Sequence, residues 1–164
     1  MAKAFLHYWV PDTAARELTR QRNPFSIGSE QLSPRKVKLG DTIWVVTVED
    51  GVFLLLGRVI VGEVIEGRAE AIARLGTDDI WDATYTVLAE PGTIEPLQPV
   101  NISPIAEHLV FKSRSAAKLT VVGGKVNPQQ LQSTRELTPQ SADLIEECWE
   151  TAEPRSNTGA QLAP

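Results

Sequence analysis

The stretch Thr42–Ile65, TIWVVTVEDGVFLLLGRVIVGEVI, decides the fold of this chain. Its first run is rich in β-branched residues and its second is almost continuously apolar, which predicts two neighbouring strands. Glu49-Asp50-Gly51 separates the runs, and Gly51 tolerates the positive φ angle of a hairpin turn. Gly57 and Gly62 interrupt the second run, so we expect bulges or bends there, as in a small closing barrel.

Shorter elements flank this hairpin on both sides. We expect, in chain order, a strand at Lys3–Val10, a helix from Asp12 or Thr13 to about Leu18, an irregular segment at 19–37, a helix at Arg68–Leu75, a strand at Ala83–Ala89, short strands near Leu109–Lys112 and Lys118–Val122, and a helix from Thr138-Pro139 to about Trp149. The sequence therefore predicts an α+β fold: a small bent, mainly antiparallel β-barrel with peripheral helices.

Length and composition fit one domain. The chain has 164 residues, of which 42% are hydrophobic and 23% charged, an ordinary globular balance. We expect one barrel domain over residues 1–151 and a disordered polar tail over 152–164. No apolar run approaches the roughly 20 residues that span a bilayer, so we expect no membrane segment. Cys148 is the only cysteine and cannot form an internal disulfide, which fits a cytoplasmic location.

Charge is distributed unevenly along the chain, whose net charge is −5. Residues 1–40 carry seven Lys or Arg against three acids, and residues 112–135 carry five against none. Residues 41–111, between them, carry three basic residues against twelve acids. The two basic segments either meet in the fold as one positive face or form two separate solvated loops.

The sequence contains no recognisable catalytic or metal-binding motif. His7 and His108 are not in a Gly-x-Ser-x-Gly context, and Cys148 lies on the apolar face of the last helix. The acidic residues at 78, 79 and 82 lack the pattern of a calcium loop. A Walker-type phosphate loop and a dinucleotide-binding glycine motif are both absent. We therefore expect a non-enzymatic protein without a metal or a cofactor.

Aromatic residues near strand ends are the remaining candidates for binding. Trp9 and Trp81 each lie next to a turn, and Phe25 lies in the basic irregular segment. Such rings either pack in the core or stack on a nucleobase, and each stack contributes about 1–3 kcal/mol. Trp44 and Trp149 have strongly apolar sequence neighbours or a helical apolar face, so we expect them in the core.

Three segments of the chain carry a family resemblance. They are His7-Tyr8-Trp9-Val10-Pro11-Asp12, Val37-Lys38-Leu39-Gly40-Asp41-Thr42-Ile43-Trp44 and Leu56–Ile65. In this order they resemble the EVE branch of the PUA-like superfamily, over about residues 3–65. The resemblance implies a bent β-barrel that reads modified bases in DNA or RNA, with a base pocket bordered by Trp9, Asn23, Phe25 and Ser26. The Gly-x-Lys-x-x-Glu-x-Arg pattern of the related ASCH proteins is absent.

These observations lead to alternative hypotheses on function. The first is a non-catalytic binding module for DNA or RNA that recognises a modified or flipped base. Its expected base-contacting residues are Trp9, Asn23, Phe25, Ser26, Arg58 and Trp81, and its expected phosphate-contacting residues are Arg22, Arg35, Lys36, Lys112 and Arg114. The second is a protein-interaction or assembly module, for example a homodimer, that keeps the barrel without the pocket. A small-molecule enzyme is the third.

Overall fold

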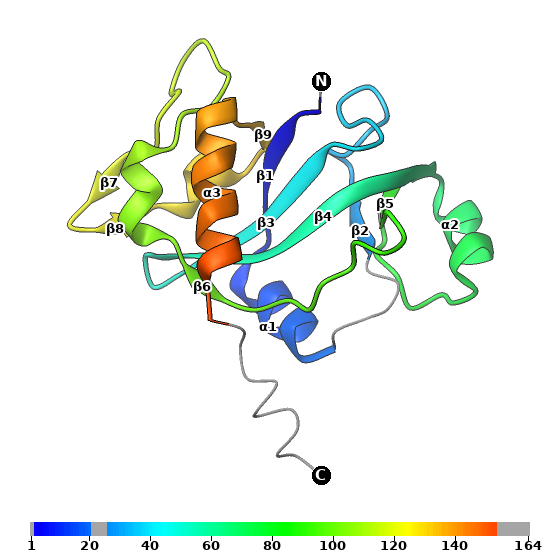
Figure 1. Ribbon diagram of the computed structural model, residues 1–164. Helices are drawn as coiled ribbons and strands as arrows, with labels where there is room; N and C mark the ends of the chain where they lie inside the picture. Colours follow the sequence, from blue (N-terminus) through cyan, green and yellow to red (C-terminus); the bar gives the residue numbers. More distant parts are fainter. Residues whose placement is uncertain (1, 21–25, 154–164) are drawn as a thin grey trace.

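The computed structural model of this protein describes residues 2–20 and 26–153. Its elements are β1 (Ala4–Tyr8), α1 (Pro11–Arg20), β2 (Ser26–Ser29), β3 (Thr42–Glu49), β4 (Val52–Glu66), α2 (Arg68–Leu75), β5 (Tyr85–Ala89), β6 (Val100–Asn101), the 3₁₀ helix η1 (Ser103–His108), β7 (Val121–Val122), β8 (Lys125–Val126), the 3₁₀ helix η2 (Pro128–Leu131), β9 (Arg135–Glu136) and α3 (Pro139–Thr151). The long strands cross the middle of the molecule, with α3 over β1 and β3 and with α2 at the far end of β4 (Figure 1).

The β3–β4 hairpin is the central element of the fold, as the sequence predicts. Its turn places Asp50 at φ 52° and Gly51 at φ 81°, which is the left-handed pair that a tight hairpin needs. The ladder register shifts opposite Val45/Val46 and again between Val61 and Glu63, so β4 is bulged near Gly57 and at Gly62. Both predicted bend positions are therefore confirmed.

The bulges let β4 pair with more than one neighbour. Its first half pairs with β3 and β6, and its second half pairs with β5. A Cβ on Gly62 would lie 2.7 Å from the backbone of Glu90, and a Cβ on Gly57 would lie 2.4 Å from a methyl group of Leu97. Close packing against backbone thus requires glycine at position 62, whereas a Cβ at position 57 would make the Leu97 side chain shift.

The sheet is mixed and open, and the predicted closed barrel is wrong on this point. The main strand order is β2-β5-β4-β3-β1-β9, with β6 on β4, and β7 and β8 form a separate pair. The β1–β3 pair is parallel and the other ladders are antiparallel. The two ends of the path, β2 and β9, are not hydrogen-bonded neighbours. The α+β class and the mainly antiparallel pairing are confirmed.

Side chains join the two ends of the open sheet. After β2, Gln31 donates to the carbonyl of Gln132 at 2.9 Å and accepts from the backbone of Thr134. Lys36 donates to the carbonyl of Thr134 at 2.5 Å. We call this junction, formed by Gln31, Lys36, Gln132 and Thr134, the seam. The seam lies between β2 and β9, where a closed barrel would have a ladder of backbone hydrogen bonds.

A separate hydrophobic core lies on each face of the sheet. Along β3, Trp44 and Val46 face one core together with Ile145 and Trp149 of α3. Ile43 and Val45 face the other, together with Trp9 and with Ala14 of α1. This alternation follows from the two-residue period of a strand. It determines which predicted site residues can meet, because side chains on opposite faces are separated by the sheet.

The helices follow their sequence signals. The Thr138 hydroxyl accepts from the backbone of Ser141, and Pro139 occupies the first turn of α3. Gly76 ends α2 in the left-handed conformation. In the described part of the chain, no helix is long and apolar enough to cross a membrane.

Two local predictions differ from the structure. β2 lies within the segment predicted to be irregular and pairs with β5, although Ser26-Ile27-Gly28-Ser29 has low strand propensity. Tertiary packing explains this, because Ile27 is fully buried. The strand predicted at Leu109–Lys112 is reduced to isolated bridges of Val110 and Phe111. The predicted tail falls, from residue 154 onward, outside the described residues.

Candidate functional site

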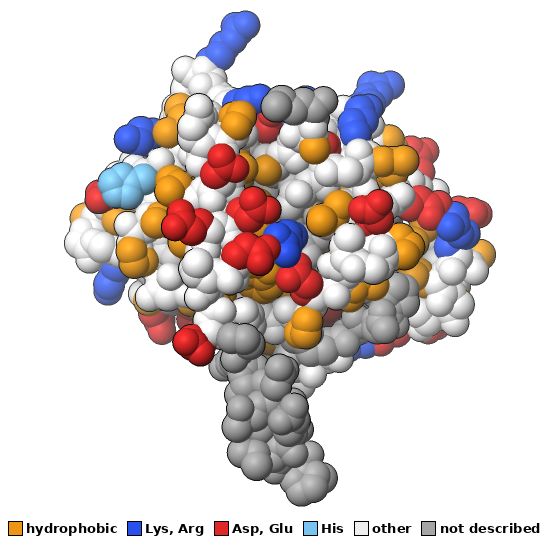
Figure 2. Space-filling model, viewed as in Figure 1, with side chains coloured by type: hydrophobic (Ala, Val, Ile, Leu, Met, Phe, Trp, Pro, Cys, Tyr) orange, Lys and Arg blue, Asp and Glu red, His pale blue; other side chains and the backbone are white. Residues whose placement is uncertain are grey.

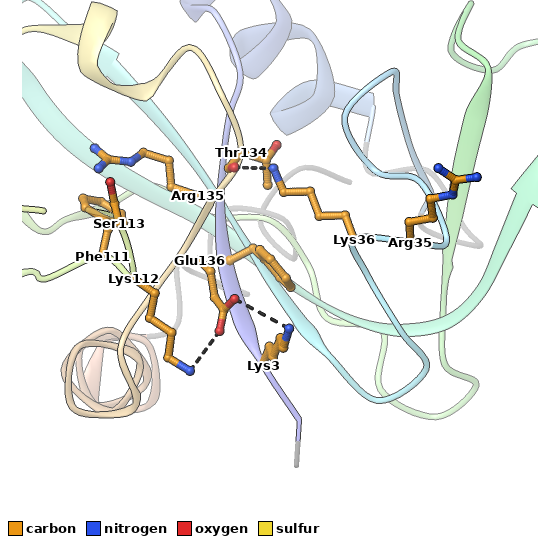
Figure 3. Close-up of a pocket in the computed structure, with 10 residues that line it drawn as sticks. Lys3, Arg35, Lys36, Phe111, Lys112, Ser113, Thr134, Arg135 and Glu136 are labelled. Atoms are coloured by element: carbon orange, nitrogen blue, oxygen red, sulfur yellow. Dashed lines mark hydrogen bonds and ion pairs between the residues drawn. The ribbon is translucent and has the colours of Figure 1, made fainter. Parts of the chain in front are cut away.

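A basic cavity of about 350 Å³ opens next to the seam (Figure 3). We define it by its five cationic side chains, one carboxylate and two aromatic rings. The cations are Lys3, Arg35, Lys36, Lys112 and Arg135, the carboxylate is Glu136, and the rings are Phe5 and Phe111. Thr134 and Ser113 complete its wall. The two basic segments of the sequence therefore meet in space.

β9 brings the later basic segment to the start of β1. Phe5 pairs with Glu136 and Leu6 with Arg135 in an antiparallel ladder. On its other side, β9 is held by the backbone hydrogen bond from Lys112 to the Glu136 carbonyl, 2.9 Å long. Cations distant in sequence thus line one cavity.

Glu136 neutralises part of the charge. Its carboxylate lies 3.0 Å from Nζ of Lys112 and 3.8 Å from Nζ of Lys3 (Figure 3). The two lysine side chains are about half exposed, so each ion pair contributes about 1 kcal/mol or less. The effect of Glu136 is to hold both ammonium groups at the cavity wall, which still carries an excess of positive charge.

Arg135 is held in place by two contacts, one with the Phe111 ring and one with the carbonyl of Ala116. Its guanidinium carbon lies 4.0 Å from the centre of the Phe111 ring, a cation–π distance. The same group donates to the carbonyl of Ala116 at 2.5 Å. Burial lowers the pKa of Arg135, but a guanidinium stays protonated at any physiological pH. It is therefore a permanent, oriented positive charge.

Lys36 is anchored over a buried histidine. Its ammonium group donates to the Thr134 carbonyl, and the Thr134 hydroxyl is 2.8 Å from Nδ1 of His7. Burial, and secondarily the charge of Lys36, lower the pKa of His7 to about 4. Burial also lowers the pKa of Lys36. His7 is therefore neutral near pH 7, and the positive charge above it comes from Lys36.

Arg35 is the least restrained cation of the cavity. It is exposed, and it has no carboxylate partner in the described parts of the chain. In Figure 3 it lies at the far end of the row that runs from Arg135 and Lys112 to Lys36. A group of this kind is available to an incoming anion. Chemically, the cavity is suited to hold phosphate or another anion rather than to transfer protons.

A second cavity of about 350 Å³ lies beside the first. It shares the side chains of Lys3, Lys112 and Glu136 with the basic cavity and extends between β1, the start of β3 and α3. Apolar residues such as Trp44 and Leu137 line it, together with acids of α3. The two cavities therefore adjoin each other at these three side chains, and we refer to the pair as the cleft.

The structure brings together some of the predicted phosphate-contacting residues. Arg35, Lys36 and Lys112 line the basic cavity, whereas Arg114 is exposed and does not. Arg22, Asn23 and Phe25 lie outside the described residues. Sequence reasoning missed Lys3 and Arg135. Arg135 belongs to the acid-free segment 112–135, so its charge was visible, but only the β1–β9 pairing reveals where it and Lys3 meet.

The predicted aromatic residues form a different group on the α1 face of the sheet. The Trp9 and Trp81 rings are 5.5 Å apart, and the guanidinium of Arg16 is 5.6 Å from the Trp81 ring. Trp81 donates through Nε1 to the carbonyl of Ser26 at 3.1 Å. Trp9 and Ser26 are buried, at 4% and 5% exposure, and Trp81 is half-buried. None of these residues lines the basic cavity.

Arg58, predicted to contact a base, does not join either group. It lies on the face opposite Trp9, with its guanidinium carbon 5.6 Å from the Trp44 ring. Glu95 and Glu150 lie 2.8 Å from its nitrogens and Glu146 lies 3.6 Å away.

These carboxylates make the face of the molecule on which α3 lies acidic. Burial acts to lower the pKa of Arg58, but its hydrogen bonds to Glu95 and Glu150 raise that pKa above the ordinary value. Acidic side chains gather in the middle of the face on which α3 lies (Figure 2). Arg58 therefore holds α3 to the sheet and is occupied by carboxylates.

Metal-binding geometry is absent from the described residues, which contain no group of three His, Cys, Asp or Glu side chains that would hold an ion. Cys148 is half-buried, and burial raises the pKa of its thiol, which disfavours the reactive thiolate form. His108 is exposed and lies 3.8 Å from Glu107.

Comparison with known proteins gives information on the fold. No protein-family model matches the sequence, and no curated protein is similar to it. The crystal structure of ASCH from Zymomonas mobilis matches with a TM-score of 0.52 at 13% identity, over 88% of this chain and 94% of that chain. Two mutants of that protein match with TM-scores of 0.52 and 0.51, at 12% and 13% identity, over 88% of this chain and 95% and 97% of theirs.

This likeness shows that the chain has the same overall fold as the ASCH protein of Zymomonas mobilis. The fold is consistent with the one that the family resemblance implies, whereas the EVE branch is not confirmed, because the matched structures are ASCH proteins. At this level of identity the likeness carries the fold alone. The similarity is notable because the sequence lacks the Gly-x-Lys-x-x-Glu-x-Arg pattern.

Proposed function

We propose that this protein is a non-catalytic module that binds single-stranded nucleic acid and holds its phosphates in the basic cavity. The observation that carries the proposal is the convergence of five cationic side chains on one cavity in a chain of net charge −5. Phosphate contacts from Lys and Arg dominate the affinity of most nucleic-acid-binding proteins. The PUA-like fold supports the same function, since family members are associated with reading bases in DNA or RNA.

A single strand fits this site better than a duplex does. The cavity is concave and about 350 Å³ in volume, which accommodates a phosphate with part of its sugar but not two paired strands. Duplex readers instead present an extended surface to a groove. The cavity therefore favours a strand end, a loop or an unpaired nucleotide. The finer hypothesis of a modified base, with contacts from Asn23 and Phe25, depends on residues outside the described ranges and remains a prediction.

Binding to a fluorescein-labelled pentanucleotide of RNA, followed by fluorescence anisotropy across a salt series, tests the proposal. A net charge of about +4 at the cavity predicts a log–log salt slope of about −3, so the affinity falls about 60-fold between 50 and 200 mM salt. The same sequence as DNA and as duplex RNA tests the choice of ligand. If none of the three oligonucleotides binds at 50 mM salt, the proposed function is refuted.

A pair of variants locates the binding site. Arg35→Ala removes a cavity cation that has no carboxylate partner in the described structure, so we expect weaker binding and a salt slope shallower by about 0.7 to 1. Lys118→Ala is the matched control, because Lys118 is an exposed cation of the later basic segment that does not line the cavity. Equal effects of both variants would show that binding depends on overall charge and not on this cavity.

A further inference from the structure

The second cavity has the surface of a site for a flat, mostly apolar group. Its apolar wall comes from Ala4, Trp44, Leu137 and Ala142, which converge from β1, β3, the segment before α3 and α3 itself. Trp44 is 2% exposed, so its position is fixed by the core below and it contributes only a small area to the wall. Rigid apolar walls of this size are typical of ligand sites.

Two carboxylates of α3 stand on the same wall. Asp143 and Glu146 are three residues apart, so they project from one side of the helix, and both line the second cavity. Asp143 is exposed and has no cationic partner in the described ranges. Glu146 lies 3.6 Å from Arg58, a loose ion pair that leaves acceptor capacity on its oxygens. The cavity therefore offers hydrogen-bond acceptors beside an apolar wall.

The two ends of the cleft carry charges of opposite sign. One end carries the cations at Arg35, Lys36 and Arg135, and the other carries Asp143 and Glu146. Lys3, Lys112 and Glu136 lie between them, because both cavities share these three residues. A ligand that spans the cleft needs an anionic part and, next to it, a flat apolar part that donates hydrogen bonds.

We propose that the second cavity is a subsite for a nucleobase that carries an exocyclic amine: cytosine, adenine or guanine. This inference rests on the proposed function and names the part of the ligand that follows the phosphate. Carboxylates are the natural acceptors for an exocyclic amine, as in the pairing of Asp or Glu with N4 of cytosine. The base ring covers the apolar wall, and the amine reaches Asp143.

Uracil fits this subsite less well than cytosine. Cytosine presents an amino donor at position 4, where uracil presents a carbonyl oxygen that repels a carboxylate. The rest of the two bases is closely similar, so the carboxylates discriminate between them by chemistry and not by size. A compact aliphatic ammonium group would satisfy the acids but would leave the apolar wall in contact with water.

Pentanucleotides UUXUU, with X as cytosine or uracil, test the subsite by anisotropy at 50 mM salt. A second pair, with X as guanosine or inosine, removes only the exocyclic amine of the base. We expect each amine-bearing oligonucleotide to bind about tenfold more tightly than its partner, in line with one good base contact. Equal affinities within both pairs would overturn the inference.

The variant Asp143→Ala separates base recognition from charge. We expect it to reduce the cytosine-to-uracil ratio to about two or less, while UUUUU binds equally or more tightly because an acid is lost. Glu147→Ala is the control, since Glu147 is an exposed acid of α3 that lines neither cavity. If Asp143→Ala shifts both affinities by the same factor, Asp143 acts by electrostatic repulsion alone and the subsite is refuted.

The two proposals fail in different ways. If every oligonucleotide binds with a steep salt slope but without preference, the nucleic-acid function holds and the base subsite does not. If none binds at 50 mM salt, the proposed function fails and the subsite fails with it. The wild-type comparison of cytosine with uracil decides the matter even if Asp143→Ala does not fold, which circular dichroism would reveal.

Discussion

Replacing His7 by asparagine will remove most of an acid-induced loss of stability. His7 is 7% exposed, and its Nδ1 shares a hydrogen bond of 2.8 Å with the hydroxyl of Thr134. Burial, together with the nearby charge of Lys36, lowers its pKa from 6.5 to about 4. Asparagine places a neutral polar atom close to the position of Nδ1, so it keeps a hydrogen-bonding group there without a titratable ring.

The sign and size of the effect follow from the two pKa values. Above pH 6.5 the imidazole is neutral in both the folded and the unfolded chain, so it contributes no pH dependence. Below pH 6.5 the unfolded chain binds a proton that the folded chain refuses until about pH 4. The free energy of unfolding therefore falls by about 1.4 kcal/mol per pH unit over this window, or about 3 kcal/mol in total.

Urea unfolding followed by tryptophan fluorescence at pH 7, 6, 5 and 4.5 measures this loss. His7→Asn costs about 1 kcal/mol at pH 7 through a poorer hydrogen bond. That difference should shrink and then reverse as the pH falls, because only the wild type has the His7 titration. His108→Asn is the control, because it removes the other histidine of the chain at an exposed position. A constant difference between wild type and His7→Asn from pH 7 to 4.5 would refute the reasoning, as would an NMR titration of His7 near 6.5.

Three further substitutions test the packing that positions the cleft. Gly28→Ala should cost about 1–3 kcal/mol in urea unfolding, because its Cβ would lie 2.1 Å from Cβ of Trp81; an unchanged midpoint would contradict that contact. Arg58→Met should cost about 1–2 kcal/mol, and a double-mutant cycle with Glu95→Gln should show coupling of about 1 kcal/mol; strict additivity would show no interaction. Thr138→Ala should cost about 1 kcal/mol through loss of the α3 cap, whereas Thr138→Ser should restore most of it.

The central hairpin was predictable because its signals are local and agree with one another. β-branched residues, a turn with Gly51 and two glycines in β4 all indicate the same structure, and the register shifts fall where the glycines predict them. The caps at Thr138 and Gly76 were visible for the same reason. β2 was not, since Ser26–Ser29 becomes a strand only through its pairing with β5 and the burial of Ile27.

The candidate site was predictable in charge but not in position. The sequence showed two basic segments, and the structure brings Arg35, Lys36 and Lys112 to one cavity. Which cations meet depends on β9, a strand of two residues whose pairing with β1 has no local signal. Arg58 shows that the partners of a charge cannot be predicted from its local sequence. An arginine within an apolar strand looks functional in sequence, but Glu95 and Glu150, distant in sequence, neutralise it.

The open sheet explains why the cavity is where it is. A closed ladder between β2 and β9 would pair their backbone groups with one another, so no side chain would be needed to satisfy them. Here Gln31 and Lys36 donate hydrogen bonds to the carbonyls of Gln132 and Thr134 instead, so polar and cationic side chains lie at this junction. Two of the seam residues, Lys36 and Thr134, thus also line the basic cavity.

The acids of the chain then favour one direction of approach for a polyanion. Glu95, Glu146 and Glu150 surround Arg58 on the α3 face and more than cancel its charge, so phosphates are repelled there. The cations at Arg35, Lys36 and Arg135 attract them at the seam. Since Glu146 also lines the second cavity, the boundary between attraction and repulsion runs along the cleft. Under the proposed function, a strand would be held by its phosphate at the basic end and excluded beyond α3, and a neutral ring that donates hydrogen bonds would be accepted between them.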